Sequence, residues 1–230
     1  INHVTVKGNT KTNDRVIMRE IRTKPGELFS RSDIIRTQRE LSQLGYFNPE
    51  KMGVNPKPNP VDGTVDIEYE VEERPNDQVE LSGGWGANQI VGTLGVTFNN
   101  FSARNIFNSK AWRPLPAGDG QRLSVRATTN GIYYQSYNAS FTEPWLGGKK
   151  PNALTVSLYH SLQTNGLKKS NDNRQAITIS GATVGLQRRL KWPDDYFMLY
   201  TGVNYQLYTL KNYKSTFLFT DGTSNNISFE

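Results

Sequence analysis

The feature that most constrains the fold is a change in strand character between Thr64 and Ala87. Before Glu73, apolar residues alternate with acidic ones, as on a strand with one buried face and one face in water. After Pro75 a second alternating segment begins, in which charge almost disappears and glycine is frequent. Its apolar and glycine positions are Val79, Leu81, Gly83, Gly84, Trp85, Gly86 and Ala87. The change predicts that a small soluble domain is followed by the first strand of a membrane barrel.

Composition supports two unlike parts. Apolar residues make up 35% of the 230, which is low for a conventional core throughout, and no run approaches the ~18 apolar residues of a spanning helix. Barrel strands alternate apolar and polar residues, so low mean hydropathy is compatible with them. Lys and Arg balance Asp and Glu at twelve each through Pro75, and the whole excess of +6 lies beyond it. These basic residues lie at segment ends beside aromatics such as Trp145 and Trp192, which favours lipid headgroups over nucleic acid.

The residues that usually bind metals or form disulfides are scarce. The chain has no Cys, and its two histidines, His3 and His160, are far apart in sequence, so no metal site and no cofactor are expected. The chain begins at Ile1 without a signal peptide, although a barrel must be exported, and we therefore expect a mature fragment.

Residues 1–75 are predicted to form an α+β domain with the order β-α-α-β-β. Apolar periodicity and capping residues define the helices, and Ser30 with Asp33 makes a capping-box-like start. The expected elements are a strand at residues 4–6, a helix capped by Thr12 or Asn13, a helix from Ser30 to a stop at Gly45, and strands near residues 51–57 and 64–73.

Several motifs of this domain resemble a POTRA domain, a periplasmic module of outer-membrane assembly and secretion proteins. They are the Gly8-Asn9 strand end, the Pro25-Gly26 break before Phe29, the run Leu41-Ser42-Gln43-Leu44-Gly45-Tyr46-Phe47, and the closing strand rich in Val and Glu. The strand near residues 52–57 contains Pro56 and precedes Pro58, which suits a sheet edge. The resemblance implies that this edge pairs with extended polypeptide by β-augmentation, through Met52, Gly53, Val54 and Asn55. The alternative is an edge that its prolines simply protect.

Residues 76–230 are predicted to supply seven or eight antiparallel transmembrane strands. The expected segments lie near residues 79–87, 90–98, 122–127, 133–141, 154–162, 176–187 and 197–207, with an eighth starting near Ser215 or ending near Glu230. A phase slip in the sixth segment predicts a bulge at Gly181. A soluble sandwich also alternates. Segments of roughly 9 to 11 residues, aromatics near their ends and basic residues just beyond favour a barrel in lipid.

A second set of motifs extends the resemblance along the chain. Phe141, Thr142, Glu143, Pro144 and Trp145, followed by Leu146-Gly147-Gly148, resemble a hairpin of BamA-type barrels, as do Phe98-Asn99-Asn100-Phe101 and Asn105-Ile106-Phe107. The chain thus resembles the BamA-type outer-membrane protein assembly factors, covering their last POTRA domain and the first half of a sixteen-stranded barrel. The Arg-Gly-Phe loop of the family's later barrel does not occur in this sequence.

The resemblance implies a function and a location. It implies non-enzymatic insertion of β-barrel proteins into the outer membrane of a Gram-negative bacterium, with the POTRA domain in the periplasm. The first barrel strand, with Val79, Leu81, Gly83, Gly84, Trp85 and Gly86, would act as a lateral gate on which substrate strands form. The implied partners are unfolded outer-membrane proteins, accessory assembly lipoproteins and outer-membrane lipid. Lys168 and Lys169 are candidates for contact with lipopolysaccharide phosphates, and the alternative is a solvated loop.

The sequence also allows other functions to be compared with this one. Within the superfamily the alternative is a secretion or translocation pore, and a porin-like channel is a further one. Glycines 83, 84 and 86 resemble a phosphate loop only superficially, because no helix follows them. A barrel-embedded lipase would need His160, which shares the outward phase of Leu158 and Leu162 and points away from any nucleophile in the lumen. No catalytic residue is therefore predicted.

Overall fold

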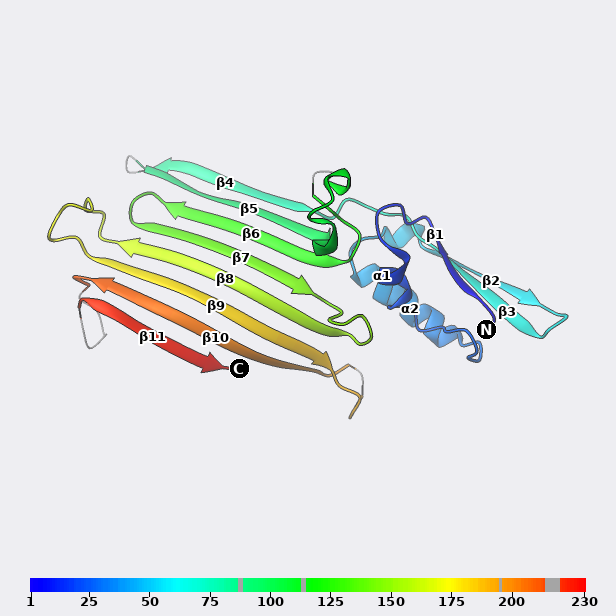
Figure 1. The fold of residues 1–230 in the computed structure, drawn as a ribbon. Helices are drawn as coiled ribbons and strands as arrows, with labels where there is room; N and C mark the ends of the chain where they lie inside the picture. The colour runs from blue at the N-terminus through cyan, green and yellow to red at the C-terminus, as the bar shows by residue number, and fades with distance from the viewer. Residues whose placement is uncertain (87–88, 113–114, 195, 214–219) are drawn as a thin grey trace. The chain divides into compact units, whose positions relative to one another are not determined.

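The computed structural model describes all residues except 87–88, 113–114, 195 and 214–219. Its contacts divide the chain into two compact units (Figure 1). The first contains Ile1–Asp77 together with Asn99–Gln121, and the second contains Gln78–Phe98 and Arg122–Glu230. A segment that lies between two barrel strands in sequence therefore belongs to the unit of the N-terminal domain.

The first unit has the predicted β-α-α-β-β order. Its sheet has the order β1-β3-β2, in which β1 (Val4–Lys7) runs parallel to β3 (Thr64–Glu70), and β2 (Gly53–Asn59) is antiparallel to β3. Helices α1 (Asp14–Met18) and α2 (Arg31–Gln43) and the short 3-10 helix η1 (Pro49–Lys51) connect β1 to β2. The core combines side chains of the helices, of β3 and of the loops beside them: Val16, Ile17, Ile21, Ile34, Leu41, Tyr46, Phe47, Ile67, Tyr69 and Val71.

The helix ends follow the predicted capping residues, with one informative difference. The Ser30 hydroxyl accepts a hydrogen bond from the Asp33 amide, and Gly45 has a φ of 76°, the left-handed stop expected there. Asn13 is the N-cap of α1, but its side chain makes no capping hydrogen bond. Its amide group instead contacts residues of the 99–121 segment, as described below. Among the described residues, no helix has the length and apolar character needed to cross a membrane.

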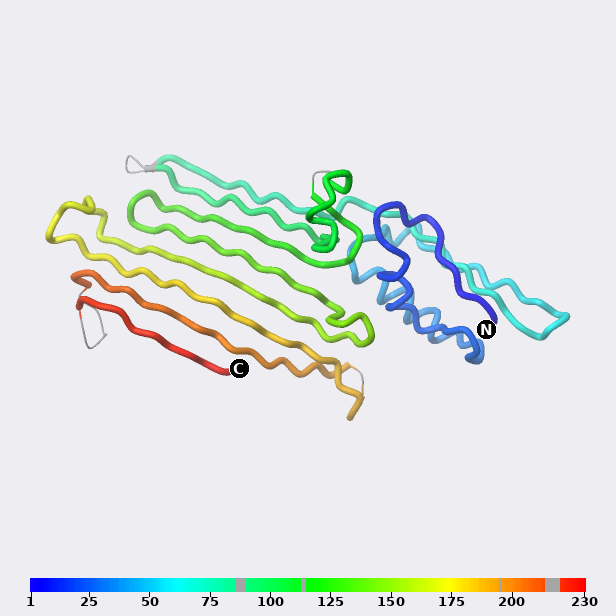
Figure 2. The backbone as a smooth tube through the Cα atoms, viewed as in Figure 1, coloured from blue at the N-terminus to red at the C-terminus, as the bar shows by residue number. Residues whose placement is uncertain are grey.

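The second unit is an open antiparallel sheet of eight strands, each paired with its neighbours in sequence (Figures 1 and 2). The sheet edges are β4 and β11. The strands are β4 (Gln78–Gly86), β5 (Gln89–Phe101), β6 (Gln121–Asn130), β7 (Tyr134–Glu143), β8 (Asn152–Thr164), β9 (Ala176–Arg189), β10 (Met198–Lys211) and β11 (Gly222–Phe229).

The registers place apolar residues opposite one another on a single face, as in the pairs Val125 with Ala139 and Leu158 with Ala182. The larger side chains of these pairs are exposed and not sealed beneath a second sheet: Val125 is 51% exposed and Leu158 is 56% exposed. The other face carries mainly polar groups, for example Thr97 hydrogen-bonded to Ser124. An exposed apolar face backed by a polar one is the pattern of a barrel wall in lipid and not of a soluble sandwich. We call the two faces outward and inward.

The predicted bulge at Gly181 is wrong. Strand β9 pairs one-to-one with both β8 and β10 along its whole length. The phase slip arises because the inward face of β9 changes character along the strand. Inward-facing Ile177 lies opposite Leu210 and is buried, whereas Gly181 lies under the Tyr159 ring, which a Cβ at this position would overlap. The eighth strand is β11, at the end of the chain, and the other predicted start, Ser215, lies outside the described residues.

Candidate functional site

Strand β2 is an edge of the first sheet, as its prolines predict, because among the described residues it pairs with β3 alone. Successive residues of an antiparallel strand direct their N–H and C=O groups to alternate edges. Pro56 and Pro58 keep the β3 ladder intact only if their nitrogens face the free edge. Val54 has the same parity, so its N–H also faces that edge. The part of β2 that can donate hydrogen bonds to an added strand is thus its first half, from Gly53 to Asn55, and Met52 directly precedes it.

Strand β4 is the corresponding edge of the second sheet. In the described part of the chain it pairs with β5 alone. Val79, Leu81 and Trp85 point outward and are 73%, 80% and 71% exposed. Nine residues of backbone therefore offer one unpaired row of hydrogen-bonding groups beside an apolar face.

The β4–β5 hairpin has no side chains on its outward face at its centre, because Gly83 lies opposite Gly92. Gly92 was not singled out from the sequence, yet its position is more constrained than those of the β4 glycines. A Cβ on Gly92 would lie 2.6 Å from the Ser82 carbonyl oxygen, whereas a Cβ on Gly84 would have nothing within 4 Å. The glycine pair removes side chains from the outward face between Leu81 and Trp85, which reduces the packing that holds β4 to β5.

An ion pair on the inward face links β4 to β6 across the intervening strand. The Arg126 guanidinium donates a hydrogen bond to the Glu80 carboxylate, and both side chains are about half exposed. The pair passes over Gly95, where a Cβ would come within 3.4 Å of Glu80 Oε2. These residues line a polar hollow together with Arg122 and Asn138. The signal in the sequence was a lone Glu in the inward phase of β4 and two arginines, Arg122 and Arg126, in the inward phase of β6.

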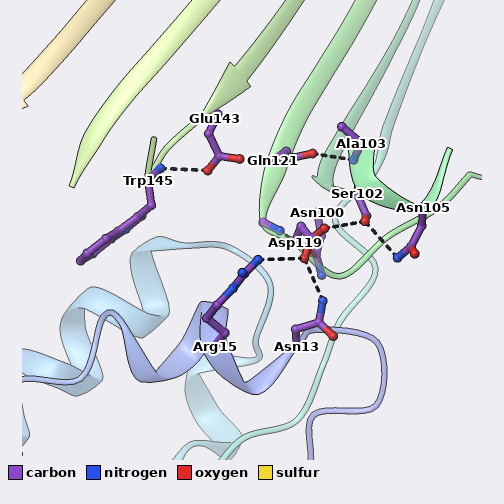
Figure 3. A network of polar contacts seen from close by, with 11 residues as sticks. Asn13, Arg15, Asn100, Ser102, Ala103, Asn105, Asp119, Gln121, Glu143 and Trp145 are labelled. Atoms are coloured by element: carbon purple, nitrogen blue, oxygen red, sulfur yellow. Dashed lines mark hydrogen bonds and ion pairs between the residues drawn. The ribbon is translucent and has the colours of Figure 1, made fainter. Parts of the chain in front are cut away.

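The motif residues Phe141 to Trp145 span the end of β7 and the start of the turn that follows it. Phe141 points outward, opposite Leu123 and Val156, while Thr142 points inward and shares a hydrogen bond with Thr155. Glu143 ends the strand, and its carboxylate accepts a hydrogen bond of 3.0 Å from the Trp145 amide (Figure 3). Gly147 and Gly148 both have positive φ, which permits the tight return to β8. The motif thus builds a specific turn.

The 99–121 segment is held to the N-terminal domain by a buried carboxylate, Asp119, which is 4% exposed (Figure 3). It accepts hydrogen bonds from the Ser102 hydroxyl at 2.6 Å and from the Asn13 side-chain amide at 2.9 Å, and Arg15 lies 3.5 Å away. This is why Asn13 does not cap its own helix. Asn13 and Asp119 are 106 residues apart, so sequence reasoning did not connect them.

Further contacts surround Asp119. The Asn100 side chain donates to the Thr12 hydroxyl and accepts from the Gly120 amide, at 2.8 and 2.9 Å. The hydroxyl of Tyr46 donates to the Gly120 carbonyl. Tyr46 belongs to the Leu41–Phe47 motif, so a residue that marks the POTRA-like fold also binds the barrel-side segment. Gly118 is required here, since its φ is +119° and a Cβ would lie 2.5 Å from the Lys11 carbonyl oxygen.

Glu73 fixes the other side of the same region. Its carboxylate accepts hydrogen bonds from the Thr10 hydroxyl and from the Lys11 and Thr12 amides. Partial burial acts to raise the pKa of the carboxyl, but the hydrogen bonds outweigh it and the pKa lies below its usual value. The ionised carboxylate therefore holds the segment before α1, from which Thr12 and Asn13 reach the 99–121 segment.

His160 lies on the outward face of β8, as its phase predicts. Its Nδ1 is 2.8 Å from the Ser180 hydroxyl oxygen, and its ring stacks on Tyr137 with centroids 6.4 Å apart. Ser180, on β9, was not considered from the sequence. Among the described residues, no cluster of three or more His, Cys, Asp or Glu side chains could hold a metal ion.

Two family profiles match the chain. Residues 1–74 match the POTRA family, described as surface antigen variable number repeat, and residues 117–228 match the Omp85 superfamily domain. The chain therefore contains a POTRA domain followed by an Omp85 superfamily domain. The two matches follow one another along the chain, as the POTRA-like and barrel-like motifs do.

Individual relatives of the chain are BamA-type proteins. It is 31% identical over 144 residues to the outer membrane protein assembly factor BamA of Nitratidesulfovibrio vulgaris, covering 63% of this chain and 16% of that protein. The crystal structure of BamA from Haemophilus ducreyi lacking POTRA domains 1–3 superposes with a TM-score of 0.66 at 18% identity. That match covers 99% of this chain and 42% of the other.

The fold is shared more widely. CdiB from Acinetobacter baumannii superposes with a TM-score of 0.55 at 13% identity, covering 100% of this chain and 41% of that one. The chain spans about a sixth of the BamA relative in sequence and about two fifths of the two solved structures. It therefore corresponds to a POTRA domain and part of a barrel.

Proposed function

We propose that the parent protein of this chain assembles and inserts β-barrel proteins into an outer membrane without enzymatic chemistry. The POTRA domain would lie in the periplasm and receive unfolded outer-membrane proteins. Accessory lipoproteins and outer-membrane lipid would be its other partners. The names of its BamA relatives support assembly as the activity.

The observation that carries this proposal is the free edge of β4. An unpaired backbone group in hydrocarbon costs several kcal/mol, so a substrate strand must find hydrogen-bonding partners as it enters the membrane. Strand β4 offers nine residues of such partners, and its glycine pair with β5 limits the packing that fixes it. A substrate strand that adds to this edge would enter the membrane already paired on one side.

Crosslinking in the full-length protein tests this role. A photoreactive residue replaces Ser82 on β4 or, as a control, Ser157 on β8, which is paired on both sides. Both side chains point inward, so the two variants differ mainly in strand position. We expect nascent barrel substrates to crosslink from residue 82 and not from residue 157. Equal crosslinking from both positions, or none from residue 82, would contradict strand addition at β4.

The same experiment distinguishes strand addition at β4 from the alternative function of a secretion or translocation pore. A pore passes its substrate through the lumen, so inward positions on several strands would crosslink to it. Depletion of the parent protein provides a second distinction. We expect folded outer-membrane proteins to decline in general, whereas a pore or a passive channel would leave other barrels unaffected.

The β2 edge has its own test. Replacing Val54 by proline removes the backbone N–H of residue 54, which faces the free edge, and leaves the hydrogen bonds between β2 and β3 intact. Val54→Ala is the matched control, because it shortens the side chain and keeps the N–H. We expect Val54→Pro to weaken binding of an unfolded outer-membrane protein several-fold more than Val54→Ala. Equal binding by the two variants would show that β2 is simply a protected edge.

A further inference from the structure

The 99–121 segment carries an exposed apolar apex. After β5, two short 3-10 turns, η2 (Ala103–Asn105) and η3 (Ser109–Ala111), project Ile106 and Phe107 between them. Phe107 is 97% exposed, and Ile106 and Trp112 are partly exposed. An aromatic side chain that is almost fully in water has no role in the packing of its own domain.

The apex is ordered by its own hydrogen bonds. The Asn108 amide donates to the Asn105 carbonyl at 3.0 Å, and the Asn108 side chain caps η3 at the Lys110 amide. The Trp112 indole donates to the Ile106 carbonyl at 2.9 Å, which satisfies its only polar group. The base of the segment is fixed to the POTRA unit through Asp119. The exposure of Phe107 is therefore a property of the folded loop, and little conformational entropy is lost when this apex binds a surface.

The charge of the apex is of one sign. Residues 99–118 contain Arg104, Lys110 and Arg113 and have no Asp or Glu. Asp119, the next carboxylate along the chain, is buried and hydrogen-bonded, and Asp14 lines the same surface hollow as Arg104. A surface that combines exposed aromatic side chains with cations is complementary to an anionic bilayer surface.

The course of the chain puts this apex beside the bilayer. Strand β5 has outward Ile90 and Leu94, both exposed, and the chain leaves the sheet at Phe101 and returns to it at Gln121. The end of a membrane-spanning strand lies at headgroup level, where aromatic and basic residues concentrate. The 99–121 segment also packs on the POTRA unit, so it belongs to the POTRA side of the membrane.

We propose that this apex inserts into the phospholipid leaflet on the POTRA side. Phe107, with Ile106 and Trp112, enters the boundary between headgroups and acyl chains, and Arg104 and Lys110 bind lipid phosphates. The proposal rests on the membrane-spanning sheet of the proposed function and not on its assembly activity. A protein that assembles no substrate could therefore still insert this loop.

Fluorescence quenching tests the insertion in the full-length protein, reconstituted in vesicles of phosphatidylethanolamine and phosphatidylglycerol. This chain has no Cys, so Phe107→Cys takes an environment-sensitive fluorophore at one site of it, after any cysteines elsewhere in the parent are replaced. The control is Val61→Cys, an apolar residue 89% exposed in the β2–β3 turn of the same unit. We expect shallow lipid nitroxides to quench residue 107 several-fold more than residue 61, and aqueous iodide to show the reverse order.

Two results would overturn the proposal. One is equal iodide quenching at residues 107 and 61, which would place the loop in water. The other is protection of residue 107 from both quenchers only when accessory proteins are present, which would make its partner a protein. The charge component has a separate readout. In protein labelled at residue 107, the double substitution Arg104→Glu and Lys110→Glu should reduce quenching by lipid nitroxides more in anionic vesicles than in neutral ones. An equal reduction in both kinds of vesicle would contradict binding of lipid phosphates by these two residues.

Discussion

At the residue scale, Glu73 is a carboxylate whose ionised form organises the segment before α1. Glu73→Gln keeps the size of the side chain and removes the charge that accepts three donors, so we expect a local loss of about 1–3 kcal/mol. Hydrogen exchange of residues 9–18 in the full-length protein measures this loss. Glu50→Gln, on the exposed η1 turn, is the control and should leave exchange of this segment unchanged.

The pH dependence of the same site has a definite sign. Because the folded pKa of Glu73 is lowered, its stabilisation is complete above the ordinary Glu pKa of about 4.3 and disappears as the pH falls through the lower folded value. We expect protection of residues 9–18, corrected for intrinsic exchange, to fall in this acidic range. In Glu73→Gln this dependence should be absent, and an unchanged acid response there would assign it to another group.

Removal of the Asp119 side chain should weaken the contact between two segments that are far apart in the sequence. Asp119→Ala leaves Ser102 and the Asn13 amide without their acceptor in a buried place, and we expect the contact between residues 99–121 and α1 to lose about 3 kcal/mol. Faster hydrogen exchange in both segments would show it. Asp172→Ala, in an exposed loop of the second unit, is the matched control. Unchanged exchange around α1 in Asp119→Ala would mean that the Asn100 and Tyr46 contacts are sufficient.

At the element scale, the β4–β5 hairpin depends on Gly92. Gly92→Ala forces the Ser82 carbonyl to move, whereas Gly84→Ala has open space, so the first should weaken β4 pairing and the second should not. Hydrogen exchange of the β4 amides should rise at least several-fold in Gly92→Ala relative to Gly84→Ala. Equal protection in the two variants would show that the hairpin adapts, and that its glycines do not set the freedom of β4.

The sequence predicted the elements better than the contacts between them. Alternation located the strands from β4 to β10, and Ser30, Asn13 and Gly45 marked helix ends, because these signals are local. The bulge at Gly181 failed because alternation does not distinguish an inserted residue from an inward face that turns apolar at Ile177. The Asp119 network was missed because Asn13 and Asp119 each look like ordinary turn residues, and only the fold brings them together.

At the scale of the whole molecule, the POTRA unit is joined to the sheet by the chain at three places. The chain passes between the units after residues 77, 98 and 121. A module on a single linker moves freely, whereas three crossings restrict it to motions that keep the β5–β6 connection in place. We therefore expect motion of the POTRA domain to act on β5, the strand that pairs with β4, as well as on β4 itself.

The buried Asp119 contact has a consequence for covalent continuity. If a protease site were placed at residues 75–77 and cut, the first 74 residues would still be gripped by the 99–121 segment. We expect the severed domain to co-purify with the membrane-embedded remainder, and to be washed away when Asp119→Ala is added. Immediate release from the otherwise unaltered protein would contradict this. If the severed domain is retained, the covalent link before β4 is not needed for attachment, and the contacts of the 99–121 segment alone hold the domain to the barrel.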